Sequence, residues 1–128
     1  MRLASVALVV RDYDEAIRYF VDVLRFVLVE DSDLGAGKRW VRVAPPGGGA
    51  ALLLARAFGS DQAEAVGNAG GGRVAFFLEV EDFRVTYDAM RARGVVFQEE
   101  PRHESYGWVA VFADLYGNRW DLIETSAA

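Results

Sequence analysis

Apolar and polar residues along the first half of the chain predict a strand, a helix and three further strands. Residues 3–10 form an apolar, β-branched run, and the carboxylates that follow are typical of a helix cap. From Tyr13 to Leu24, apolar residues recur at three- and four-residue spacing, which predicts a helix with one buried face. The segments after the helix are predicted as a strand, a polar turn and two strands: 26–30, 31–38, 40–44 and 50–56.

Residues 57–72 differ in composition from the segments on either side. They are rich in Gly, Ala, Ser, Asp and Asn and end in three consecutive glycines. A flexible connector is the main interpretation, with a short helical turn at 61–66 as an option. A phosphate-binding loop is not indicated, because such glycines lie between a strand and a helix.

The second half of the chain repeats the order of the first. The predicted elements are a strand, a helix, a strand, a turn region and two strands: 73–80, 83–93, 95–99, 101–106, 108–113 and 119–125. The residues that begin each helix also correspond, Asp12-Tyr13 in the first half and Asp82-Phe83 in the second. A βαβββ module is therefore predicted twice, at about 1–56 and 73–125.

The closing strand has two different faces. By alternation, Arg119, Asp121 and Ile123 share one face, while Trp120 and Leu122 share the other and would pack under a helix. Asp121 is interpreted either as the partner of a nearby arginine or as an anchor for a ligand. In the turn before this strand, Gly117 and Asn118 are expected to adopt positive φ for structural reasons.

Composition narrows the function classes. The chain has 128 residues, of which 52% are hydrophobic, so one compact soluble domain is expected. Its formal charge of −5, without a basic cluster among aromatics, argues against a nucleic-acid partner. The absence of cysteine excludes disulfides, thiolate metal sites and a cysteine nucleophile, and is compatible with the cytoplasm, where we expect the protein.

The first apolar run does not indicate a membrane partner. Arg11 and Asp12 interrupt it, so it is too short for a signal peptide or a membrane span.

The tandem modules, the Asp-aromatic helix starts and the Phe-x-Asp-x-x-Gly-Asn turn at 112–118 resemble the vicinal oxygen chelate superfamily. This superfamily includes glyoxalase I, extradiol dioxygenases and the bleomycin-resistance proteins, and the resemblance covers residues 3–125. It implies an α+β fold in which curved mixed sheets surround a shared cavity, with helices on the convex side, so that 1–128 is a single domain. It also implies a homodimer, with the modules paired either within one chain or across two chains.

The resemblance places four metal-ligand positions in this sequence. They fall on Ser5, on Leu52 or Leu53, on Ala75 and on Asp121, whereas enzymes of the superfamily use His, Glu or Gln there. Only Asp121 is an ordinary metal ligand. A site without metal, and a protein without a cofactor, are therefore expected.

The leading hypothesis is that the protein binds a small organic molecule, a drug or a metabolite, in an aromatic-lined cavity, in the manner of the bleomycin-resistance proteins. The candidate ligand-binding residues are Ser5, Trp40, Phe77, Tyr106, Trp108 and Asp121.

An enzyme is the alternative hypothesis. A lyase or isomerase would use Asp121, Glu79 or His103 as a general acid or base, and a dioxygenase-like member would have an atypical metal site. His103 is the only imidazole and lies in a polar loop, where solvated histidines are common, while Glu79 alternates with Phe77 near a strand end. A regulatory module is a weaker third hypothesis.

Overall fold

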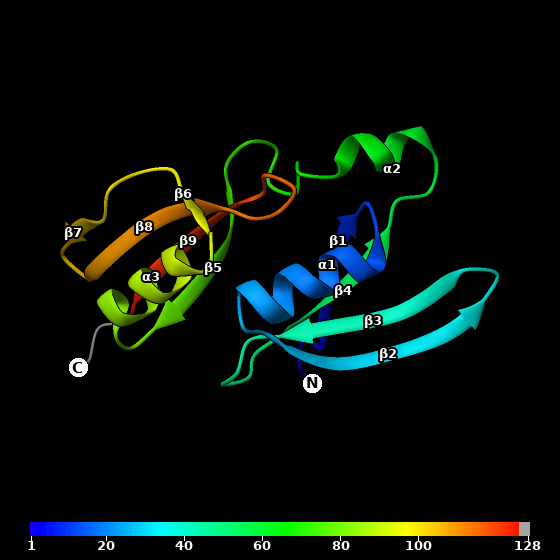
Figure 1. Ribbon diagram of the computed structural model, residues 1–128, viewed down its shortest axis with the longest axis horizontal. Helices are drawn as coiled ribbons and strands as arrows, with labels where there is room; N and C mark the ends of the chain where they lie inside the picture. The colour runs from blue at the N-terminus through cyan, green and yellow to red at the C-terminus, as the bar shows by residue number, and fades with distance from the viewer. Residues whose placement is uncertain (126–128) are drawn as a thin grey trace. The chain divides into compact units, whose positions relative to one another are not determined.

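The computed structural model describes residues 1–125, and the chain divides into two compact units. Unit 1 comprises residues 1–69 and unit 2 begins at Gly70. Each unit contains one mixed β-sheet with a helix packed on one face, as Figure 1 shows for the blue-to-green and green-to-red parts of the chain. The α+β class is therefore confirmed.

Unit 1 consists of β1 (Ser5–Val10), α1 (Tyr13–Arg18), the π-helical turn η1 (Tyr19–Val23), β2 (Val27–Gly35), β3 (Lys38–Ala44), β4 (Ala51–Arg56) and α2 (Gly59–Ala65). Its strands lie in the order β1-β4-β3-β2, in which only the β1 and β4 pair is parallel. The helical turn predicted within the connector is thus present as α2, three residues after β4 ends.

The α1–η1 segment covers one face of the unit 1 sheet. Asp12 caps α1 by accepting a hydrogen bond from the Glu15 N–H at 2.8 Å, and apolar side chains at three- and four-residue spacing then turn inward. The buried apolar residues of this layer include Leu8, Val10, Ala16, Phe20, Val41, Val43 and Leu54. The apolar residues that alternate in the strands and those that recur at helical spacing in α1 therefore pack together in one core.

Two predictions in unit 1 are wrong in detail. The helix is α-helical only to Arg18 and continues as a π-helical turn, in which the Leu24 N–H donates to the Tyr19 carbonyl at 3.0 Å. The polar turn predicted at 31–38 is mostly strand, because β2 continues to Gly35. Its polar side chains find partners across the strand pair, as when Arg39 binds Asp31 through two nitrogens.

Unit 2 consists of β5 (Val74–Val80), α3 (Phe83–Ala92), β6 (Val96–Phe97), β7 (Arg102–Glu104), β8 (Gly107–Ala113) and β9 (Arg119–Glu124). The sheet order is β5-β9-β8-β6, with β7 also pairing with β8. The β5 and β9 pair is parallel and the other pairs are antiparallel.

The strand predicted at 95–99 is shorter than expected, and the turn region at 101–106 contains the strand β7. Where pairing with β8 is interrupted, the Glu99 carboxylate accepts a hydrogen bond from the Val111 N–H at 3.1 Å. A side chain thus takes the place of a backbone acceptor, which a pattern of apolar residues does not reveal.

Helix α3 packs on the face of the unit 2 sheet that carries Trp120 and Leu122, as alternation predicted. Both are buried, with 3% and 0% of their surface exposed. Phe112 stacks on Trp120 at a centroid distance of 5.7 Å, and Phe83 and Tyr87 of α3 close the core. The opposite face of β9, with Arg119 and Asp121, is therefore the one that α3 leaves uncovered.

The turn before β9 is held by a buried carboxylate. Asp114 accepts hydrogen bonds from the N–H groups of Tyr116 and Asn118, each at 3.0 Å, from the Asn118 amide at 3.1 Å and from the Trp120 indole at 3.0 Å. Gly117 has the expected positive φ of 93°, whereas the prediction of positive φ for Asn118 is wrong. Asn118 is instead buried as a partner of Asp114.

Across residues 1–125, the helices are all too short or too polar to traverse a lipid bilayer.

Candidate functional site

Asp121 lies in the middle of β9, on the face of the unit 2 sheet opposite α3. The strand register places it between Phe77 of β5 and Val111 of β8. The side chain is half-buried, and its Oδ1 atom is buried without a hydrogen-bond partner among the residues that the structure describes. A buried carboxylate oxygen without a hydrogen-bond partner is a group for which a ligand or a water molecule is an expected partner.

The cations near Asp121 are engaged elsewhere. The Arg102 Nε atom lies 3.1 Å from both carboxylate oxygens of Glu99, and its Nη1 atom lies 2.7 Å from Glu104. Arg119 donates to the Gln98 amide oxygen at 3.1 Å. The first interpretation of Asp121, as an ion-pair partner of an arginine, is therefore not what the described residues show.

Burial raises the pKa of Asp121 above the ordinary value of 3.8. The positive charges of Arg102 and Arg119 act in the opposite direction, and the negative charge of Glu99 adds to the rise. The carboxyl group therefore keeps its proton to a higher pH than a solvated aspartate does, and hydrogen bonds donated by a ligand would offset its loss of hydration.

Two other candidates lie on β5. Phe77, directly beside Asp121, leaves 61% of its surface exposed, which is unusual for an aromatic side chain in a strand. Glu79 is exposed near the end of the same strand. Phe77 and Asp121 thus place an exposed aromatic ring beside a half-buried carboxylate.

The structure places Trp108 and His103 on the other side of the same sheet. Trp108 stacks on Phe83 of α3 at 6.4 Å, and the His103 ring lies 4.8 Å from the Trp108 ring. Tyr106 is 42% exposed in the turn between β7 and β8. Among the unit 2 candidates, Phe77 and Asp121 are neighbours on the face opposite α3, whereas His103 and Trp108 are neighbours on the face toward α3.

The unit 1 candidates lie on the face of their sheet opposite α1. The Ser5 hydroxyl accepts a hydrogen bond from the Arg42 Nε atom at 3.0 Å, and Arg42 also lies 3.5 Å from the Glu30 carboxylate. Sequence reasoning missed Arg42. Its alternation with Trp40 on β3 would have placed it on this face, where a long cationic side chain can reach across β4 to β1.

The residues at the four implied metal-ligand positions do not fit a divalent metal. Leu53 shares the face of Ser5 but has no donor atom, Leu52 is buried in the core, and Ala75 has no donor atom. The Ser5 hydroxyl already accepts from a guanidinium, and a second cation there would be repelled. Within residues 1–125, no three His, Cys, Asp or Glu side chains lie together as a metal-binding group.

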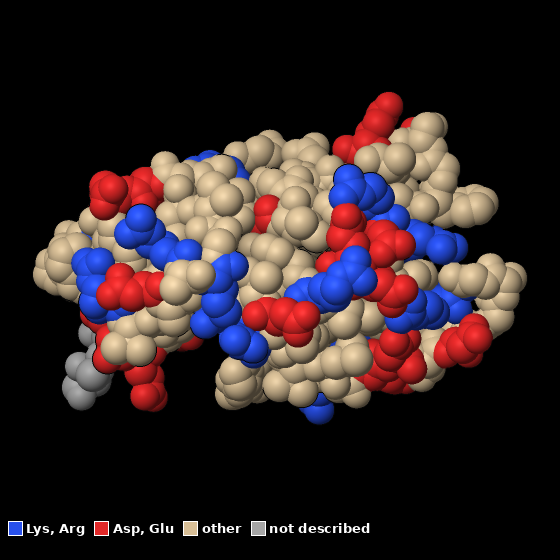
Figure 2. All heavy atoms as spheres, in the orientation of Figure 1, with Lys and Arg blue, Asp and Glu red and all other residues tan. Residues whose placement is uncertain are grey.

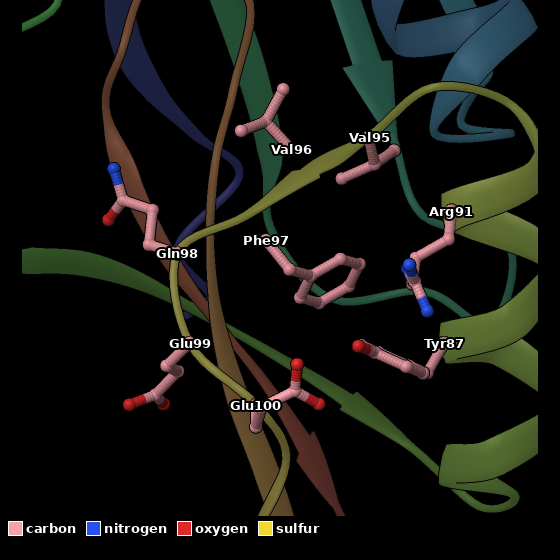
Figure 3. Close-up of a pocket in the computed structure, with 8 residues that line it drawn as sticks. All are labelled: Tyr87, Arg91, Val95, Val96, Phe97, Gln98, Glu99 and Glu100. Carbon is pink, nitrogen blue, oxygen red and sulfur yellow. The ribbon is translucent and has the colours of Figure 1, made fainter.

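Two hollows are relevant to ligand binding. One, of about 410 Å³, lies between Tyr87 and Arg91 of α3 and the segment 95–100, and Figure 3 shows the Phe97 ring projecting into it. None of the predicted ligand-binding residues lines it. The second, of about 690 Å³, lies entirely in unit 1 and includes the predicted residue Trp40.

Comparison with known proteins agrees with the fold. The family model described as Glyoxalase/Bleomycin resistance protein/Dioxygenase superfamily matches residues 2–122. The chain belongs to this superfamily. The resemblance inferred from its repeated motifs is thereby confirmed.

Individual relatives differ in how much they indicate about function. An uncharacterized protein of Shewanella frigidimarina (strain NCIMB 400) is 49% identical over 95% of this chain and 92% of its own length. The crystal structure of UcmS2 has a TM-score of 0.82 at 29% identity, covering 95% of this chain and 96% of that one. TnmS3, described as an antibiotic binding protein from Streptomyces sp. CB03234, has a TM-score of 0.78 at 25% identity, covering 98% and 97% of the two chains.

Proposed function

We propose that this superfamily member binds a small organic molecule without a metal ion, and that Asp121 is the polar anchor of the site. The proposal rests on the buried Asp121 Oδ1 atom, which has no hydrogen-bond partner among the described residues and lies beside the exposed Phe77 ring. A ligand with a hydroxyl or amine donor and a flat apolar part would satisfy both groups.

Two further observations support binding rather than metal chemistry. The donor atoms at the implied metal positions do not fit a divalent ion, and a structurally similar protein is described as antibiotic binding. Sequestration of a drug or metabolite needs affinity but no reacting group. An unpaired acceptor and an aromatic surface are sufficient for that purpose.

The remaining candidates have different parts in this proposal. Tyr106, in the same unit as Asp121, is proposed as an additional ligand contact, whereas the ligand contacts predicted for Ser5 and Trp40, in unit 1, stay predictions. Trp108 packs against Phe83 beneath the sheet, so we propose that it supports the sheet rather than forming a wall of the site.

The experiment is titration calorimetry of aromatic antibiotics, with and without a hydroxyl or amine donor, in the presence of EDTA. We expect a donor-bearing compound to bind, and Asp121→Ala to weaken its binding about tenfold, as for loss of a charged hydrogen bond. Asp88→Asn, on the exposed face of α3, is the control for loss of a surface carboxylate. Stoichiometric metal in the purified protein, or a full effect in the control, would contradict the proposal.

The second candidate function is metal-independent acid–base catalysis by a lyase or isomerase. The raised pKa of Asp121 favours it, because a carboxyl group that titrates nearer neutral pH is a better proton-transfer group. Asp121→Asn separates the two functions. Retained affinity with lost turnover of a bound compound supports the enzyme, whereas parallel loss of affinity, with no turnover by the parent protein, supports the binding protein.

We also propose that the protein is a cytoplasmic homodimer. The β2 strand lies at an edge of its sheet and exposes Val27, Leu28, Val29 and Leu34, each with 40% or more of its surface accessible. An exposed apolar edge of this kind favours association with another chain. Sedimentation equilibrium at micromolar concentration tests the dimer, and a species with the mass of one chain alone would contradict it.

A further inference from the structure

The largest hollow described above lies in unit 1, far in sequence from Asp121. Its walls come from the β2–β3 hairpin, from the end of β4 and from the start of α2, which Figure 1 shows in cyan and green. Its volume of about 690 Å³ lies within the range of pockets that hold small organic ligands. The hollow can therefore be considered as a binding site separate from the Asp121 face.

Basic side chains line this hollow, and no acidic residue does. Lys38, Arg39 and Arg56 are its charged lining residues. Arg39 is neutralised by Asp31, at 2.8 Å, and by Asp14, at 2.9 Å. Lys38 and Arg56 form no ion pair with a described residue. Because two carboxylates pair with Arg39, these five side chains together carry one net positive charge, in a protein whose net charge is −5.

The Arg56 side chain is exposed and has two neighbours that limit its movement. Its guanidinium lies 5.3 Å from the centroid of the Tyr13 ring. A cation–π interaction at this distance stabilises the guanidinium in this position. Gly37 lies alongside, and a Cβ atom there would be 3.4 Å from the Arg56 Nη2 atom. A guanidinium whose movement is already limited loses less conformational entropy when it binds an anion. Figure 2 shows blue atoms in the recess between α2 and the hairpin.

Two aromatic side chains of the same hollow are exposed to water. Trp40 has 40% of its surface accessible, and Phe58, at the N-terminal end of α2, has 87%. The Phe58 backbone is held in place, since its N–H donates to the Gln62 side-chain oxygen at 2.9 Å. Large exposed aromatic side chains beside a hollow provide apolar surface. A flat ligand that stacked on them would bury this surface away from water.

We propose that this hollow binds a planar aromatic carboxylate. The aromatic part contacts Trp40 and Phe58, and the carboxylate accepts hydrogen bonds from Arg56 and Lys38. Arginine suits a carboxylate because its planar fork donates two parallel hydrogen bonds. This site takes an anion, whereas Asp121 requires a hydrogen-bond donor, so the two proposals concern different ligand groups and fail independently.

The first experiment compares two probes of one shape, 2-naphthoate and the neutral 2-naphthamide, by titration calorimetry with the intact protein. We expect naphthoate to bind about tenfold more tightly, because only it is an anion and pairs its negative charge with Arg56 and Lys38. The difference should shrink as the salt concentration rises, since salt screens exposed charges. Equal affinities at low salt, or no binding of naphthoate, would overturn the proposal.

The second experiment locates the charge. Arg56→Gln should weaken naphthoate about tenfold and leave naphthamide within about twofold, and Arg56→Lys should restore part of the loss. Arg18→Gln removes the same charge from the exposed face of α1 and should change neither affinity. Circular dichroism confirms that each variant is folded. Equal weakening of both probes by Arg56→Gln, or an equal effect of Arg18→Gln on naphthoate, would overturn the assignment to this pocket.

Discussion

Each unit has a strand, a helix and further strands in that order, with a helix on one face of its sheet, but the two units treat the polar groups of the opposite face differently. In unit 1 the Arg42 guanidinium has partners in Ser5 and Glu30. In unit 2 the Asp121 Oδ1 atom is buried with no described partner. Two similar modules can therefore have the same kind of apolar core although one of them, on the face opposite its helix, contains a buried carboxylate oxygen with no described partner. Ligand binding is expected at such a group.

The turns before the final strand of each module also differ. Residues 45–49 combine prolines with three glycines at positive φ and bury no polar side chain. Residues 114–118 are organised instead by the buried Asp114 carboxylate, which accepts four hydrogen bonds. The unit 2 turn is thus held by specific contacts and the unit 1 turn by backbone conformation.

Replacing Asp114 tests this difference and should have the largest effect. Asp114→Ala removes the acceptor of the Trp120 indole and of two backbone N–H groups, and we expect a loss of about 3 kcal/mol in the free energy of unfolding. Pro46→Ala, in the exposed turn of unit 1, should change it by less than about 0.5 kcal/mol. Urea titration measures both, and similar effects would show that the two turns are equivalent.

The exit of each helix is a second point of correspondence. In each unit, one residue with a left-handed backbone conformation follows the helix and precedes a buried residue. This residue is Arg25 in unit 1, with φ of 63°, and Gly94 in unit 2, with φ of 93°. Gly94→Ala should destabilise the protein by about 1 to 2 kcal/mol, because a Cβ disfavours this conformation. Gly94→Asn should cost less, and thermal or urea unfolding of the pair provides the measurement. A cost for asparagine as large as that for alanine would contradict this explanation.

The unpaired state of Asp121 predicts a pH-dependent effect. A raised pKa in the folded protein means that ionisation costs more there than in the unfolded chain, so this cost is absent at low pH and appears as the pH rises. Asp121→Asn should therefore stabilise the protein at pH 7, by at most about 1 kcal/mol for a half-buried group.

The gain from Asp121→Asn should disappear below the ordinary carboxyl pKa of 3.8. Urea unfolding at pH 3 and pH 7 gives both values. Asp88→Asn serves as control, because this exposed carboxylate pairs with Arg84 and its loss should cost a few tenths of a kcal/mol at pH 7. A stabilisation by Asp121→Asn that is equal at the two pH values would contradict the assignment.

The smallest effect is expected at Arg25, the unit 1 counterpart of Gly94. Arg25→Gly removes the strain of positive φ but adds freedom to the unfolded chain, so a net gain of about 0.5 kcal/mol is expected. Differential scanning calorimetry would detect the rise in Tm. A fall instead would show that the Arg25 side chain contributes more than its backbone costs.

The sequence by itself determined most of the strands and helices and the two faces of the closing strand. Alternation placed Trp120 and Leu122 under a helix and Asp121 on the other face, since side chains on a strand must alternate. Family membership followed from the order and spacing of the repeated motifs. These are local properties, set by the neighbours of each residue along the chain.

Partners across strands were decided only by the tertiary structure. Arg42 donates a hydrogen bond to Ser5, which lies 37 positions away in the sequence. Asp121 has no arginine partner among the described residues because the nearby Arg102 pairs with Glu99 and Glu104. Pairing of this kind depends on strand order and register, which bring together residues that no sequence spacing connects. The grouping of Lys38, Arg56 and Phe58 around one hollow arose in the same way, from the meeting of a hairpin, a strand end and a helix start.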